Sequence, residues 1–289
     1  MIDRFLGVFL CVYCVKITQE FDLMSILAEM DVNLAEMKNR RSEGYRRIDL
    51  DISANWVTPI HLIALAASSN LHGIRINCNV SNHMTRKYID RIKFPRGTRS
   101  VLSSGTAIPL TSLDSHKDDN VLDEYDDRIL RNVKSQFRKS FRNTLKYMTS
   151  ELTTNIREHS WSERYWILAQ HWPNTATCEI AIADTGIGYL ESYRGTDYEV
   201  NNHHDAITNA LEGRSSKNNV ERGAGIPSTV RIFTEGYGGE VVVMTGEAIR
   251  IIRGKRSEKY SMRNYWHGSL IGLRFDMKNV NIHPYLSGN

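Results

Sequence analysis

Cysteine is scarce in this chain, and the four residues present do not form a recognisable metal-binding or disulfide pattern. Cys11 and Cys14 make a CxxC, but no second pair lies nearby to complete a zinc site. Cys78 and Cys178 stand alone, so the cysteine content does not require an oxidising compartment. We therefore interpret the CxxC as two small apolar residues.

The sequence also lacks a hydrophobic run long enough to cross a bilayer. The longest run, FLGVFLCVYCV at Phe5–Val15, has the length of a signal-peptide core, but no Ala-x-Ala cleavage pattern follows it. A buried strand or helix explains the run equally well, and a translation start at Met24 would leave it outside the protein. We expect a cytoplasmic protein without a membrane-spanning segment.

A strong excess of charge of one sign is absent as well. The chain has 37 basic and 33 acidic residues, an excess too small to indicate nucleic-acid binding. The basic run at Arg250–Lys259 is interpreted as a solvated loop. With 41% hydrophobic and 24% charged residues, the composition is that of a globular protein. A length of 289 residues suggests two domains or one large one.

A small α/β module is expected at residues 45–97, after an amino-terminal segment of residues 1–44. Alternating and helical hydrophobic patterns succeed each other here, with proline and glycine at the expected helix ends. The predicted elements are, in order, a strand at 46–53, a helix from Pro59 to Gly73, a strand at 74–80 and a helix at 84–92.

This β-α-β-α pattern loosely resembles the STAS-type domains that partner bacterial regulatory kinases. Those domains often carry a phosphorylatable serine at a strand-to-helix corner. The corresponding corner here is VTPIHL, in which Thr58 is the only hydroxyl. We expect Thr58 to cap the helix that follows.

The composition changes at residues 98–126, which we interpret as a linker. The stretch SSGTAIPLTSLDSHKDDN is rich in Ser, Thr and Asp. Helical spacing resumes near Asp127 and continues to His159, with room for one break. A second domain is therefore expected at residues 127–289.

The stretch ELTTNIREHS, within this helix, places polar groups on a strip beside an apolar stripe. Glu151, Asn155 and Glu158 share one face of a regular α-helix. By the same geometry His159 falls nearer the apolar stripe, so we expect it to be packed inside. An amphipathic helix with a solvated polar side is the alternative interpretation of the stretch.

The segment CEIAIADTGIGYL predicts a strand that ends in an acid and two spaced glycines. Strict alternation in CEIAIAD indicates a strand with one face in a core. Asp184 could accept a hydrogen bond from an exocyclic amine, and Gly186 and Gly188 would let the backbone approach a flat base. A tight turn uses the same residues and is the alternative.

A glycine loop before a helix follows in GRSSKNNVERGAGIPSTVRIF. Gly223 and Gly225 come just before Ile226-Pro227, where a helix start is expected. Such a loop can bind phosphate through its free N–H groups, or it can be a flexible turn. Beyond it, residues 238–254 are interpreted as two strands joined around Gly246, and residues 267–277 as a further strand.

The order of these elements resembles that of the GHKL ATPases, the family that includes histidine kinases, DNA gyrase and the anti-sigma-factor serine kinases. The resemblance covers residues 127–277, and ELTTNIREHS is most similar to the anti-sigma-type kinases. It implies an α/β fold: a two-layer, Bergerat-type sandwich in which helices cover one face of a mixed, mostly antiparallel sheet. The small α/β module precedes this domain.

The resemblance also implies roles for the polar strip and the acid-glycine turn. Asn155 would be a ligand of Mg²⁺, and Glu151 would be the catalytic base of ATP hydrolysis or phosphoryl transfer. Asp184 would bind the adenine amino group, and Gly186 and Gly188 would make room for the ring.

For the remaining positions, the resemblance implies a lid over the triphosphate made by Gly223 and Gly225, with Lys217 as its cation. Ser269 lies where the family commonly has a threonine near adenine. Glu158 departs from the Lys or Arg of many members, which argues against direct phosphate binding at that position.

ATP and Mg²⁺ are thus the expected ligands, and the expected function is regulatory: Mg-dependent phosphoryl transfer to a protein Ser/Thr, or slow ATP hydrolysis. The alternative is a non-catalytic, nucleotide-gated interaction switch. A histidine kinase ranks last, because residues 130–152 contain no histidine to receive phosphate. We expect a protein partner, and neither a membrane nor a specific nucleic acid; a homodimer is left open.

Overall fold

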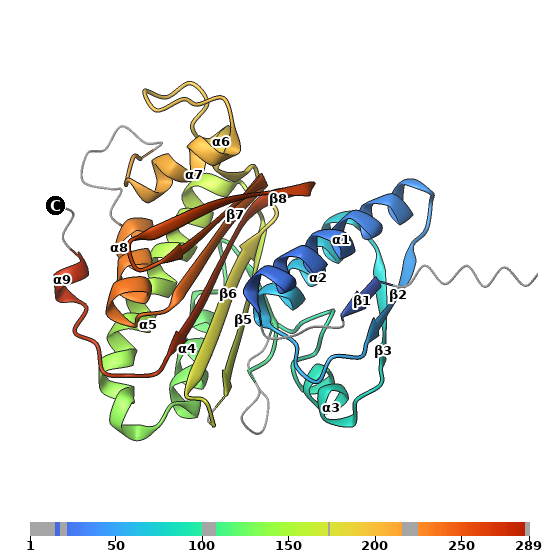
Figure 1. Cartoon of the computed structure of the whole chain (residues 1–289), viewed down its shortest axis with the longest axis horizontal. Coiled ribbons are helices and arrows are strands. Elements are labelled where there is room, and N and C mark those ends of the chain that lie inside the picture. The colour runs from blue at the N-terminus through green and yellow to red at the C-terminus, as the bar shows by residue number, and fades with distance from the viewer. Residues whose placement is uncertain (1–14, 18–21, 100–107, 173, 216–224, 287–289) are drawn as a thin grey trace, which may run out of the picture.

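The computed structural model describes residues 15–17, 22–99, 108–172, 174–215 and 225–286 (Figure 1). They form an α/β protein with a three-stranded parallel sheet and a five-stranded sheet. No helix within these ranges is both long and apolar enough to span a bilayer.

The amino-terminal module begins earlier than the boundary expected at Tyr45. Its parallel strands are β1 (Val15–Ile17), β2 (Arg47–Ile52) and β3 (Arg75–Val80), and its helices are α1 (Leu23–Ser42), α2 (Pro59–His72) and α3 (His83–Arg91). The strands and helices expected between residues 46 and 92 are confirmed. Before them, α1 buries Ile26, Met30, Leu34 and Met37, a helical spacing that marks one face.

The five-stranded sheet is antiparallel at every pairing, whereas the resemblance implied a mixed sheet. Its strands, in spatial order, are β4 (Thr111–Asp114), β5 (Arg164–Trp172), β6 (Thr177–Asp184), β8 (Arg256–Asp276) and β7 (Glu240–Arg253). The edge strand β4 lies inside the expected linker of residues 98–126. Residues 238–254 contain one strand with an irregularity at Gly246, where two strands were expected.

The helical region before the site is interrupted once, as the sequence allowed. Helix α4 (Asp119–Asn132) ends where Val133 takes an extended conformation, and α5 (Ser135–Asn155) follows. A π-helical turn, η1 (Ile156–Ser160), continues α5 directly. The other helical elements are α6 (Gly188–Ser192), α7 (His203–Leu211), α8 (Gly225–Arg231), η2 (Ile232–Gly236) and α9 (His283–Leu286).

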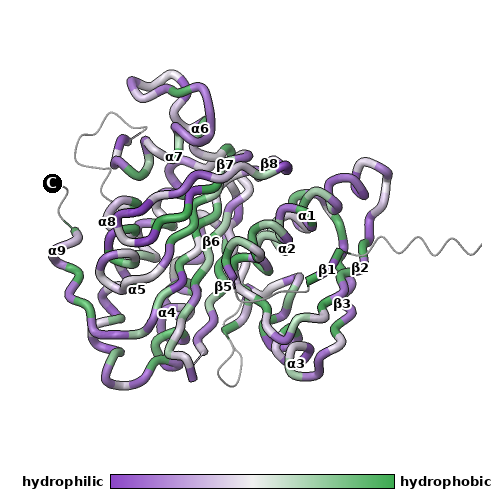
Figure 2. Tube along the Cα trace, viewed as in Figure 1, coloured by the Kyte–Doolittle hydropathy of each residue, from purple (hydrophilic) through white to green (hydrophobic). Residues whose placement is uncertain are grey.

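Both faces of the five-stranded sheet are covered, in contrast to the single covered face that was expected. Helices α4, α5, α7 and α8 pack on one face, and α1 and α2 lie between the other face and the parallel sheet (Figure 1). Alternate residues of β6 pack on opposite faces of the sheet. Ile180 and Ile182 belong to the hydrophobic cluster with α4, α5, α7 and α8, and Ala181 and Ala183 to the cluster with α1 and α2. The segments that face one another across the two sides of the large sheet are correspondingly rich in hydrophobic residues (Figure 2).

Thr58 does not cap α2, although the sequence led us to expect it. It is buried and makes no capping hydrogen bond, and its hydroxyl has no partner among the described residues. Glu179 of β6 replaces it, because its Oε1 accepts a hydrogen bond of 2.9 Å from the backbone N–H of Ile60 in the first turn of α2. The module is therefore fixed to the large sheet by the start of α2.

Candidate functional site

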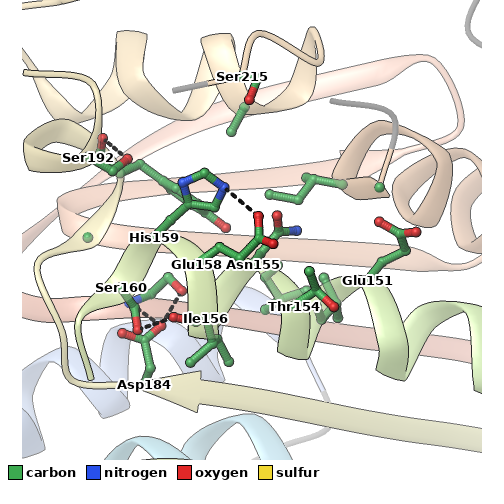
Figure 3. Close-up of a pocket in the computed structure, with 18 of the residues that line it drawn as sticks. Glu151, Thr154, Asn155, Ile156, Glu158, His159, Ser160, Asp184, Ser192 and Ser215 are labelled. Carbon is green, nitrogen blue, oxygen red and sulfur yellow. Dashed lines mark hydrogen bonds and ion pairs between the residues drawn. The ribbon is translucent and has the colours of Figure 1, made fainter. Parts of the chain in front are cut away.

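A cavity of about 350 Å³ lies where α5 and η1 face α6, α8 and the ends of β6 and β8. This volume is within the range of small-molecule sites. Six of the predicted site residues line it: Glu151, Asn155, Asp184, Gly188, Gly225 and Ser269. In Figure 3, Asp184 lies toward one end of the cavity and Glu151 toward the other.

Asp184 is buried at the end of β6 and is held by three hydrogen bonds. Its Oδ1 accepts the N–H of Gly186 at 2.8 Å, and its Oδ2 accepts the hydroxyl of Ser269 at 2.6 Å and the N–H of Ser269 at 3.2 Å. Burial raises the pKa of Asp184 to about 6, although these hydrogen bonds oppose the shift. A carboxylate offers about four acceptor positions, so one is left for a ligand.

The glycines of the DTGIG turn have different roles. Gly186 does not line the cavity; a side chain there would collide with the backbone carbonyl of Ser160. Its N–H orients Asp184 instead. Gly188 does line the cavity, has a φ of +73°, and leaves no room for a Cβ beside Thr245 and Gly268.

An irregularity in β8 brings Ser269 to Asp184. Between the pairs Met244–Leu270 and Gly246–Trp266, residues 267–269 of β8 stand opposite the single residue Thr245 of β7. The extra residues bend the strand locally. Gly268, with a φ of +87°, makes this path possible, because a Cβ there would collide with Asp184.

On the helix side, Glu151 and Asn155 face the cavity as expected. Both are half-buried, and neither side chain has a hydrogen-bond partner among the described residues. Burial raises the pKa of Glu151. Gly225, the first residue of α8, packs so closely on the Glu151 carboxylate that any side chain at 225 would displace it.

His159 lines the cavity, so the expectation that it packs inside is wrong. The reason is the π-helical turn at Ile156–Ser160. A π-turn closes i to i+5 hydrogen bonds and uses more residues than an α-turn, which rotates the residues beyond Asn155 away from their α-helical angles. The His159 ring instead lies beside Glu158, with 4.0 Å between Nε2 and Oε2 (Figure 3).

Several other lining residues were missed at the sequence level. Ile182 and Ile271 form apolar walls two residues from Asp184 and Ser269, and the period of a strand could have identified both. Arg214 offers no such signal. It enters the lining because its backbone carbonyl accepts the Tyr193 hydroxyl at 2.7 Å and its side chain bonds Asn209 at 2.8 Å.

Lys217 and Gly223 lie outside the described residues, in 216–224. The described lining contains three acidic residues, Glu151, Glu158 and Asp184, against two basic ones, Arg214 and His159. An anionic ligand would therefore need an accompanying cation.

The donor set is compatible with Mg²⁺ but not with a closed protein metal centre. No group of three His, Cys, Asp or Glu side chains in the described ranges could hold a metal ion. Mg²⁺ is usually held by one or two protein oxygens together with water and substrate phosphates. The Asn155 amide, facing the cavity with no other hydrogen-bond partner described, fits that mode.

Comparisons of the chain with protein-family models, curated proteins and solved structures find no match.

Proposed function

We propose that this protein binds Mg-ATP in the cavity and acts in the cytoplasm as a GHKL-type regulatory ATPase or protein serine/threonine kinase. One observation carries the proposal: residues from three distant parts of the chain line one cavity. They are Glu151 and Asn155 of α5, Asp184 of β6 and Ser269 of β8. The same arrangement supports a Bergerat-type fold for the larger unit.

The Asp184 end suits the base of the nucleotide. The one free acceptor position of Asp184 matches a single amino N–H of adenine. Ile182 and Ile271 give the ring apolar surfaces, and Gly188 lets it approach the backbone. These features together favour a flat, amine-bearing heterocycle.

The Glu151 end suits the triphosphate. Asn155 would hold Mg²⁺, which supplies charge compensation between the phosphates and the nearby carboxylates. The protein's own chemistry falls to Glu151, a half-buried acid with a raised pKa. It would take the proton from a Ser/Thr hydroxyl or a water whose oxygen attacks the γ-phosphorus. The bond to the β–γ bridging oxygen breaks, and ADP leaves.

The test uses purified full-length protein, γ-labelled ATP and Mg²⁺, with and without candidate protein partners. Label on a partner Ser or Thr would identify a kinase, and free labelled phosphate an ATPase. Binding without either product would identify the alternative, a nucleotide-gated switch. That alternative is favoured by one observation: the amino-terminal module packs against the strands of the site. Absence of ATP binding would refute the proposal.

ATP affinity is expected to depend on pH through Asp184. Only the carboxylate form accepts the amine, and the pKa of Asp184 without ligand is about 6. Affinity should therefore be close to its maximum at about pH 7 and above, about half of it near pH 6, and about tenfold lower at about pH 5. Titration with adenosine, which lacks phosphates, isolates this group; a flat profile with adenosine would contradict the assignment.

Arg214 is expected to contribute to triphosphate binding. Its present ion pair with Glu212, at 2.7 Å, is exposed and therefore weak, so a phosphate could replace Glu212. Arg214→Ala should weaken ATP binding about tenfold and leave adenosine binding unchanged. The matched control is Arg194→Ala, which removes an exposed ion pair with Glu191 outside the cavity. Equal effects of both variants on ATP binding would contradict this role.

A further inference from the structure

The amino-terminal module contacts the two strands that carry the base end of the cavity. Glu179 of β6 accepts a hydrogen bond through Oε1 from the backbone N–H of Ile60 in α2. Its Oε2 accepts from the side chain of Arg274 of β8, at 2.9–3.0 Å. A Cβ at Gly272 would lie 2.5 Å from the Ile60 side chain, so α2 rests directly on β8. These contacts lie on the carboxyl-terminal side of Ser269.

A second contact lies on the other side of Ser269 and comes from α1. Asp31 accepts two backbone hydrogen bonds from β8, from the N–H of Arg263 at 2.9 Å and from the N–H of Asn264 at 3.0 Å. These N–H groups are available because residues 262–265 stand opposite the single residue Glu247 of β7, so the ladder is broken there. Asp31 thus replaces the missing partner strand.

The path of β8 from this contact to Ser269 is short, and most of it lies in the two irregularities of the β7–β8 ladder. It passes through the paired residue Trp266 and then through the second irregularity, which contains Gly268. A strand segment without regular ladder bonds depends on other contacts to fix its position. The carboxylate of Asp31 provides that contact for the segment that leads to Ser269.

We propose that Asp31 is a positioning residue for the nucleotide site: by fixing the interrupted segment of β8, the amino-terminal module sets the geometry of the Ser269–Asp184 pair. This inference rests on the proposed ATP binding. It gives the module a defined role, control of base selectivity from the opposite face of the sheet. The coupling is reciprocal, so bound ATP stabilises the contact between Asp31 and β8.

The first test compares the affinities of full-length protein for ATP and ITP. These differ in the amino or oxo group at position 6 of the purine and in the adjacent N1, which is an acceptor in adenine and an N–H donor in hypoxanthine. Asp31→Asn keeps the shape but turns an NH₂ toward one of the two N–H donors. It should reduce the ATP-to-ITP affinity ratio about fivefold. A purely structural role of Asp31 would change triphosphate binding or the folded fraction. Such changes affect both nucleotides equally, so they do not alter the ratio of the two affinities.

The control is Asp22→Asn, the same charge change at the start of the same helix. Asp22 accepts hydrogen bonds from Ser25, at 2.9 and 3.0 Å, and Asn also caps helices well. Its affinity ratio should equal that of the wild type. An unchanged ratio in Asp31→Asn would overturn the inference; a wild type that binds neither nucleotide would instead refute the proposed function.

The second test needs no variant. Hydrogen exchange of the wild-type Arg263 and Asn264 amides should slow about fivefold when ATP saturates the protein. Exchange that is unaffected by bound ATP would overturn the inference even if Asp31→Asn failed to fold.

Discussion

Asp184→Asn is expected to reduce ATP affinity by more than about tenfold. The carboxylate uses both oxygens to accept from Gly186 and Ser269, and the remaining acceptor position would serve the amino group of adenine. An amide has one oxygen and one NH₂ group. In either orientation the NH₂ meets a donor, from the protein or from the base amine, inside a buried site where a lost partner is costly. Calorimetric titration with Mg-ATP measures the effect.

The matched control is Asp276→Asn. Asp276 also links β6 and β8, since it accepts the Thr177 hydroxyl at 3.0 Å, but it does so at the exposed far end of the strands. Its ATP affinity should match that of the wild type. If Asp184→Asn bound ATP as tightly as this control, the base site would have been assigned to the wrong end of the cavity.

Glu151→Ala is expected to abolish turnover while ATP remains bound. General bases contribute about 10²- to 10⁴-fold to rates, and a half-buried carboxyl with a raised pKa and no described hydrogen-bond partner is suited to the task. Single-turnover release or transfer of labelled phosphate measures the rate, and a separate titration measures ATP affinity.

Glu163→Gln provides the comparison, because Glu163 is exposed beyond η1 and does not line the cavity. Turnover by this variant should match that of the wild type. Undiminished turnover in Glu151→Ala would exclude Glu151 as the base and direct attention to Glu158, the other carboxylate on this side of the cavity.

Much of the site could be predicted because its residues follow regular periods. Glu151 and Asn155 lie one α-helical turn apart, and Asp184 ends a strand that alternates cleanly. Where the backbone is regular, the spacing of two residues in the sequence determines whether their side chains lie on the same face of the helix or strand. The strands and helices of residues 46–92 were predicted for the same reason.

The errors arose where the backbone departs from those periods or where distant segments meet. The π-turn moved His159 into the cavity, and no residue type in IREHS announces such a turn. The strand β4 was hidden in a polar stretch because it is four residues long and lies at an edge. The alternation of CEIAIAD suggested one buried face, yet α2 covers the second, and its small alanines leave room for the helix.

The double covering of the large sheet makes the chain hard to divide. A fragment that began at residue 108 would expose Trp166, Leu168, Met244 and Trp266, which now share one hydrophobic cluster with residues of α1 and α2. An exposed apolar patch of this kind promotes self-association. The five-stranded sheet and the helices of the cavity would then be obtainable in soluble form only together with the segment that precedes them.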